Sequence, residues 1–190
     1  MFTTTLAAFL GGFFTAIFAE PFRRWIFRPR LALEFTNADH FLSRTREQGG
    51  HEAIYLRVKV TNRKSALAKS CRAYLVNIER RGSSGAWEST EYCESAQLAW
   101  SARGDGKYTA LDLPKDVPHF IDILSTREAD PSKFIPTIEV MLLRYVSLIQ
   151  THGTYRLTIA VSGDGVQPAW IKLSFRWSGV WNQLAVEAVD

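Results

Sequence analysis

The stretch IYLRVKVTN, residues 54–62, decides the fold class, because apolar and polar side chains alternate along most of it. In an extended strand its isoleucine, leucine and two valines would point to one side, and the residues between them to the other. Period-two alternation is typical of a strand that buries one face and leaves the other in water. The stretch therefore predicts a half-buried strand of an antiparallel sheet.

The same alternation recurs in three further stretches, which are residues 31–36, 155–161 and 171–177. Additional strands are expected at 71–80, 96–100, 119–126 and 138–148. The run IEVMLLRYVSLI (138–149) also fits a short helix, so both interpretations stay open for it.

Turn-forming segments separate these runs. SGDG (162–165) precedes the last alternating stretch, and Asp105-Gly106 is a hairpin signal. Residues 37–50 read as a long polar connection, and residues 81–89 as a flexible excursion. No long helical pattern follows residue 30. About seven to nine short strands predict an all-β fold, an immunoglobulin-like antiparallel β-sandwich over residues 31–190.

Two stretches resemble a known family. In YLRVKVTNRKSALAKSCRAYLVNIE (55–79) a strand ends in V-x-N, and a polar turn and an alanine lead into a second strand. The closing stretch GTYRLTIAVSGDGVQPAWIKLSF (153–175) is similar to the final hairpin of such sandwiches. Together they resemble bacterial immunoglobulin-like domains of the CARDB kind, although Arg63 and Lys64 stand where family members usually carry glycine. The resemblance implies a non-catalytic binding or adhesion module.

An apolar run precedes the sandwich. No charged residue occurs from Phe2 to Ala19. As a helix this run would extend about 27 Å, close to the ~30 Å hydrocarbon core of a bilayer. A secretory signal peptide requires positive charge before its apolar run, and here there is none. The sequence predicts one N-terminal transmembrane helix over residues 1–22, with a buried core helix as the alternative.

A basic collar, residues 23–30, follows this helix. Its candidate membrane-interface residues are Arg23, Arg24, Trp25, Arg28 and Arg30. Arginines on the C-terminal flank place that flank inside by the positive-inside rule. We therefore expect a single-pass protein of the bacterial inner membrane, with its N-terminus outside and its soluble domain in the cytoplasm. The membrane partner would be an anionic inner leaflet.

Small residues recur every four positions in the predicted span, at Ala8, Gly12 and Ala16. Small residues at this spacing let two helices approach closely in lipid. We expect a homo-oligomer formed through the span.

The net charge of +4 belongs to the collar. The chain has 23 basic and 19 acidic residues, so removing the four collar arginines and Glu20 leaves 19 and 18. This balance predicts no nucleic-acid partner.

The sequence contains no catalytic motif and no metal-ligand spacing, so we predict a protein that is not an enzyme and has no cofactor. Cys71 reads as a buried small side chain and Cys93 as a loop thiol, with one disulfide left open. The remaining enzyme hypothesis is a site that tertiary proximity assembles around His119, His152 or Cys93.

A candidate ligand or partner face follows the central strand and the turn after it, and consists of Tyr55, Arg57, Lys59, Arg63 and Lys64. Aromatic and cationic side chains side by side suit a phosphate-bearing ligand, whereas a plain solvated strand face is the alternative. The predicted function is a membrane-anchored, non-catalytic protein that presents a cytoplasmic β-sandwich to an unidentified protein partner or for sensing. The alternative is a ligand-gated effector whose sandwich binds a small nucleotide or other anion.

Overall fold

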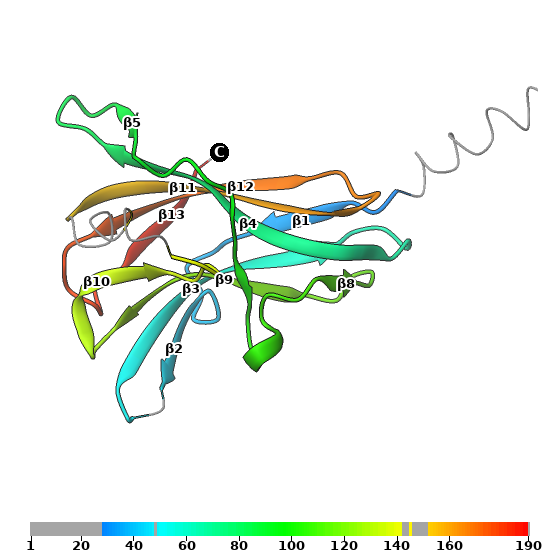
Figure 1. The fold of residues 1–190 in the computed structure, drawn as a ribbon, viewed down its shortest axis with the longest axis horizontal. Coiled ribbons are helices and arrows are strands. Elements are labelled where there is room, and N and C mark those ends of the chain that lie inside the picture. Colours follow the sequence, from blue (N-terminus) through cyan, green and yellow to red (C-terminus); the bar gives the residue numbers. More distant parts are fainter. Residues whose placement is uncertain (1–27, 48, 142–144, 146–151, 190) are drawn as a thin grey trace, which may run out of the picture.

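The structure is a computed structural model of the chain, and it describes residues 28–47, 49–141, 145 and 152–189. The described part is all-β, with two antiparallel sheets that form the two layers of a sandwich (Figure 1). The six-stranded sheet contains β1 (Leu31–Glu34), β2 (Leu42–Arg46), β3 (Glu52–Asn62), β7 (Ala99–Trp100), β9 (His119–Arg127) and β10 (Asp130–Pro136). The seven-stranded sheet contains β4 (Ala68–Arg81), β5 (Trp87–Ser89), β6 (Ala96–Gln97), β8 (Leu111–Leu113), β11 (Gly153–Asp164), β12 (Ala169–Trp177) and β13 (Ala185–Val189).

Strand β3 is the organising strand of the six-stranded sheet. It pairs with β9 on one side, and on the other with β2 along its first half and β1 along its second half. The seven-stranded sheet is ordered β13-β12-β11-β4-β5, and β6 and β8 pair with β4 as well. In this order β10 lies at one edge of the six-stranded sheet and β13 at one edge of the seven-stranded sheet.

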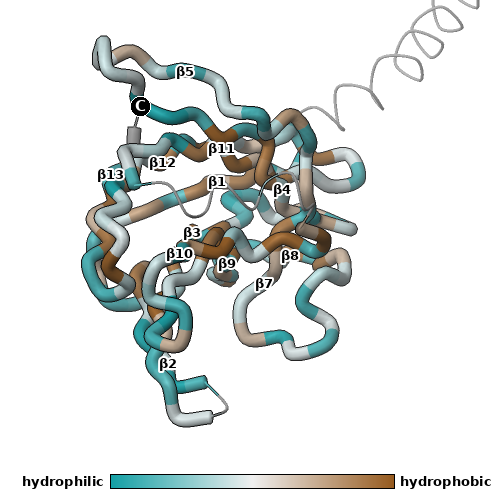
Figure 2. Tube along the Cα trace, turned by 60° about the vertical axis from the view of Figure 1, so that its left-hand side comes forward, coloured by the Kyte–Doolittle hydropathy of each residue, from teal (hydrophilic) through white to brown (hydrophobic). Residues whose placement is uncertain are grey.

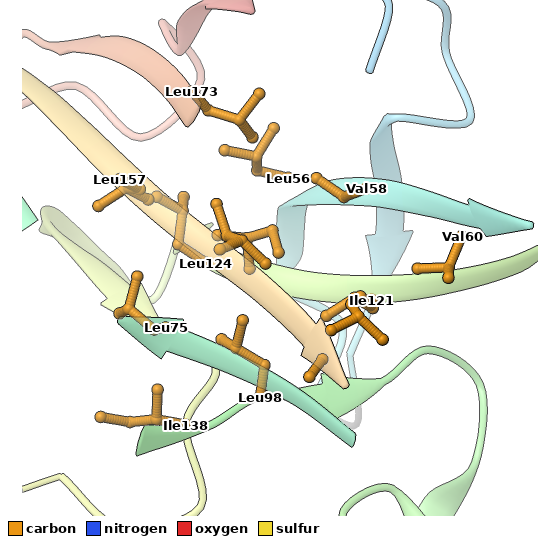
Figure 3. Packing of buried hydrophobic residues seen from close by; sticks show 14 of the residues in the cluster. Leu56, Val58, Val60, Leu75, Leu98, Ile121, Leu124, Ile138, Leu157 and Leu173 are labelled. Carbon is orange, nitrogen blue, oxygen red and sulfur yellow. The ribbon is translucent and has the colours of Figure 1, made fainter. Parts of the chain in front are cut away.

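One hydrophobic core lies between the sheets. Leu56 and Val58 of β3 are fully buried in it, as are Leu75 of β4 and Leu173 of β12. Figure 3 shows side chains from both sheets pointing toward one another, and Figure 2 shows the loop beyond β2 to be hydrophilic. The apolar side chains of residues 54–60 therefore face the core as predicted. The prediction of an all-β fold with two packed antiparallel sheets is confirmed.

The described residues contain thirteen strands, more than the seven to nine expected. The polar connection 37–50 contains β2, and the excursion 81–89 contains β5. Strands β8, β10 and β13 were also not predicted. Most of these strands are short or lie at a sheet edge, where backbone hydrogen bonds hold a strand that carries little hydrophobic alternation.

One further expectation was wrong in detail, and another is tested only in part. Asp105-Gly106 lies in a 3-10 helix, Gly104–Gly106, because the amide of Lys107 bonds the carbonyl of Gly104 at 3.3 Å. The described residues of 138–148 form no strand, and Ile138 makes an isolated bridge with Leu98. The rest of that range, apart from residue 145, lies outside the described residues.

Candidate functional site

The outer side of the six-stranded sheet carries the predicted face, and three of the four cations of that face contact carboxylates. The Arg57 Nε donates to Asp122 Oδ1 on β9 at 2.8 Å. Lys59 and Arg63 both contact the carboxylate of Glu34 on β1. The hydrogen bond from Lys59 is the main reason why the pKa of Glu34 lies below its ordinary value. These three cations therefore form structural ion pairs.

Tyr55 has a partner of the same kind. Its hydroxyl donates to Glu47 Oε1 at 2.8 Å, and Arg127 Nε lies 3.3 Å from the same oxygen. Burial, and then the hydrogen bond to Glu47, raise the pKa of Tyr55. We call Tyr55, Arg57 and Lys59, with their carboxylate partners, the paired face.

An aromatic cluster covers part of the same sheet next to Lys59. Phe41 is only 2% exposed, and its ring centroid lies 5.6 Å from Phe35, 4.4 Å from His40 and 5.8 Å from Phe120. The Phe41 carbonyl also accepts a 2.7 Å bond from the amide of Arg57. Sequence reasoning missed this cluster, although the pair His40-Phe41 inside a polar connection was an available signal.

The seven-stranded sheet carries a second ion pair on its outer side. Arg156 donates from Nε and Nη2 to the two carboxylate oxygens of Glu79, both at 2.7 Å, and stacks 4.6 Å from the Trp87 ring. Both charged side chains are less than one-fifth exposed. A two-pronged bond of this kind holds β11 to β4 with a defined geometry.

The Glu79–Arg156 pair predicts a specific pH dependence. The bond from Arg156 lowers the pKa of Glu79 below its ordinary 4.5, against the opposing effect of burial. Because the folded-state pKa is depressed, the stabilisation is complete above about pH 4.5 and is lost as the pH falls through the folded value. Glu79→Gln should cost about 1–2 kcal/mol of unfolding free energy at neutral pH and progressively less as the pH falls below 4.5.

Urea unfolding of the wild-type chain and of Glu79→Gln at neutral pH and near pH 3 checks this. Glu91→Gln, at an exposed carboxylate, is the control and should change stability little at either pH. A cost of Glu79→Gln that stays constant with pH would contradict the assignment.

Four segments far apart in the sequence meet at the end of the sandwich where the described chain begins. They are residues 28–30, the β3–β4 turn 63–67, the β8–β9 turn 114–118, and residues 164–168, which are the last residue of β11 and the β11–β12 turn. The Arg63 amide bonds the Arg30 carbonyl at 2.8 Å, and Arg28 Nε bonds the Gly165 carbonyl at 2.8 Å. The Asp116 amide bonds the Asn62 carbonyl at 2.9 Å. On the right of Figure 1 these turns lie together, and we call them the basic end.

The basic end carries five basic and two acidic side chains, a formal charge of +3. Asp116 lies 3.6 Å from Lys115, and Arg63 is held by Glu34. Arg28, Arg30 and Lys64 are exposed, and none of them forms an ion pair with another described residue. Unlike the paired face, this end keeps cations free for a partner.

Hydrophobic side chains are exposed at the same end. Leu67 in the β3–β4 turn is 42% exposed, and Val117 in the β8–β9 turn is 43% exposed. Trp170 is 59% exposed and is the second residue of β12, directly after the β11–β12 turn of the basic end. Leu67 and Val117 therefore lie exposed in the two turns that carry Lys64 and Lys115.

The opposite end of β3 has the opposite charge. At that end β2 leads into β3, and β9 leads into β10. The segments 46–52 and 127–130, where these strands meet, carry four acidic and two basic side chains. The amide of Glu52 donates a 3.0 Å hydrogen bond to Glu128 Oε2, and Nδ1 of His51 lies 3.8 Å from the same oxygen. This far end of the six-stranded sheet therefore carries a formal −2, whereas Arg80 and Arg81 are exposed at the corresponding end of the seven-stranded sheet.

Two adjoining hollows, of about 700 and 480 Å³, lie along the edge strand β13. Arg176, Leu184 and Ala185 line both of them, and Asn37 and Leu42 of the other sheet border the larger one. Strand β13 pairs with β12, and no other described strand pairs with it. This edge offers backbone hydrogen-bonding groups together with a recess for side chains.

The residues of the enzyme hypothesis are not gathered at one place. His119 pairs with Val60 in the half of β3 nearer the basic end, whereas the ring of His152 lies against Gly179 beyond the end of β12. Cys71 is buried, and desolvation raises the pKa of its thiol to about 11, while Cys93 is exposed and both thiols are free. Among the described residues no group of three or more His, Cys, Asp or Glu side chains is placed to share a metal ion.

Part of the predicted site lies outside the described residues. This holds for the collar residues Arg23, Arg24 and Trp25 and for the span residues Ala8, Gly12 and Ala16. Within the ranges that the structure describes, no helix is long and apolar enough to cross a membrane. No protein-family model matches the chain, and no similar curated protein or solved structure was found.

Proposed function

We propose that this chain is a non-catalytic membrane protein in which residues 1–22 form a single span and residues 31–190 an immunoglobulin-like sandwich on the cytoplasmic side. The observation that carries the proposal is the position of the basic end. Free cations gather where the apolar run and its arginine collar join the sandwich. Cations on this side of a span favour the cytoplasmic location.

The protein-partner part of the proposal rests on the edge strand β13. A partner segment would add to its free edge as a further strand, with side chains entering the hollow beside Arg176 and Leu184. Association of spans through Ala8, Gly12 and Ala16 would present more than one such edge. The candidate face predicted from the sequence gives little support to the nucleotide-gated alternative, because its Arg57, Lys59 and Arg63 already contact carboxylates.

Membrane extraction with sided thiol labelling tests the anchor. The full chain should stay in the membrane pellet through salt and carbonate washes, and a membrane-impermeant maleimide should label Cys93 only after the cells are opened. Cys93 is the accessible thiol, since Cys71 is buried with a raised pKa. Cys93→Ser is the labelling control.

Deletion of residues 2–22 should release the protein into the soluble or salt-extractable fraction. Retention of this shortened chain through both washes would refute the span. Labelling of Cys93 in intact cells would place the sandwich on the opposite side of the membrane.

A further inference from the structure

We propose that the basic end is a lipid-contact surface, with Leu67 and Val117 seated among the headgroups of an anionic leaflet. The surrounding cations bind the lipid phosphates, and Trp170 lies at the rim. The inference rests on the proposed function, because it names the surface on which an anchored sandwich sits. It adds an orientation, with the basic end against the bilayer and the opposite end of the sandwich away from it.

The connection between the apolar run and the basic end limits how far the sandwich can stand from the bilayer. Arg28 is nine positions after Ala19, and even a fully extended chain of nine steps spans only about 30 Å. Arg28 is then fixed to the sandwich by its bond to the Gly165 carbonyl. The basic end is therefore the part of the sandwich closest to the predicted headgroup layer.

Charge selects the same orientation. The basic end carries a formal +3, so the field of an anionic leaflet attracts it. Arg28, Arg30 and Lys64 are exposed and free of ion pairs with described residues, as phosphate-binding side chains must be. The paired face, in contrast, has its cations neutralised and offers no comparable attraction.

The exposed hydrophobic side chains of the basic end would reach below the lipid phosphates. Leu67 and Val117 belong to the turns on either side of Asn62, which is bonded to both. The bonds of Asn62 therefore hold the two turns together, and Lys64 lies in one turn and Lys115 in the other. Apolar side chains flanked by lysine and arginine are the composition that seats in the boundary between headgroups and acyl chains.

Site-directed fluorescence on the full-length chain in vesicles tests the contact. The background is Cys93→Ser, which leaves Cys71 buried and unreactive. A polarity-sensitive dye is attached at Leu67→Cys or Val117→Cys, and at Val180→Cys as control. Val180 is 40% exposed, which matches the 42% and 43% of the two test positions, but it lies beyond β12 toward the far end.

In phosphatidylcholine vesicles that contain phosphatidylglycerol, nitroxide lipids should quench the dye at 67 and 117 several-fold more than at 180. The double substitution Lys64→Glu and Lys115→Glu should reduce quenching at 67 toward the value at 180. Equal quenching at all three positions would overturn the proposal. Equal quenching with and without phosphatidylglycerol would overturn the assignment of the cations to lipid phosphate.

Flotation of the same vesicles separates the two levels of the proposal. A chain that floats with the vesicles but shows no quenching at 67 and 117 is anchored without the contact, and only the inference fails. A chain that does not float refutes the anchor, and with it the proposed function. Circular dichroism of each variant confirms that the sandwich is folded before quenching is compared.

Discussion

Replacing Phe134 with alanine lowers the free energy of unfolding by about 3–5 kcal/mol. Phe134 belongs to β10 of one sheet, and its ring contacts three aromatic rings of the other sheet. The ring centroids lie at 5.1 Å for Tyr155, 5.1 Å for Phe175 and 5.9 Å for Trp177. All four side chains are at most 1% exposed. Truncation therefore opens a cavity where the two sheets are joined.

Denaturant unfolding of the full-length chain, followed by circular dichroism, measures this loss. Val180→Ala is the exposed control, and we expect it to change stability by no more than about 0.5 kcal/mol. Phe134→Leu keeps part of the ring volume and should cost less than half as much as the alanine variant. Equal stabilities of Phe134→Ala and Val180→Ala would mean that Phe134 does not join the sheets as described.

Replacing Arg57 with methionine should cost about 2–4 kcal/mol, because it leaves the Asp122 carboxylate without its guanidinium. Asp122 is 8% exposed, and the 2.8 Å bond from Arg57 Nε is the ion pair that the structure gives it. Breaking a fully buried ion pair costs about 3–5 kcal/mol of unfolding free energy. The Arg57–Asp122 pair is partly exposed, so we expect a smaller loss.

A double-mutant cycle separates a structural pair from a ligand site. Arg57→Met combined with Asp122→Leu should cost clearly less than the sum of the two single changes, because no unpaired charge remains. Additive losses, or an unchanged stability of Arg57→Met together with lost binding of a nucleotide, would contradict the structural role. The second outcome would favour the ligand-gated alternative.

The predicted face shows how far sequence reasoning reached into the site. Alternation placed Tyr55, Arg57 and Lys59 on one side of β3, away from the core. The partners were not predictable, because a β-bulge in the β3–β9 ladder shifts the register after Leu56. That shift sets Asp122 opposite Arg57, and a displacement of one residue would bring a different side chain there.

The basic end could not be assembled from the sequence for a related reason. Arg30, Leu67, Val117 and Gly165 are separated by tens of residues, and no local pattern links them. Their segments meet because β1, β4, β9 and β11 each end or begin at this side of the sandwich. The turn residues look like ordinary polar connections until the sheets pair.

The sequence by itself determined what depends on neighbours along the chain. Strand β3 followed from the alternation of residues 54–60, since the pleat puts every second side chain on the same face. The tertiary structure decided what depends on pairing between distant strands. It gave Glu34, Asp122 and Glu79 their cations, made a strand of the polar residues 42–46 and gathered four turns into the basic end. Register and strand order arise from contacts across the sheets, and these form only when the whole chain packs.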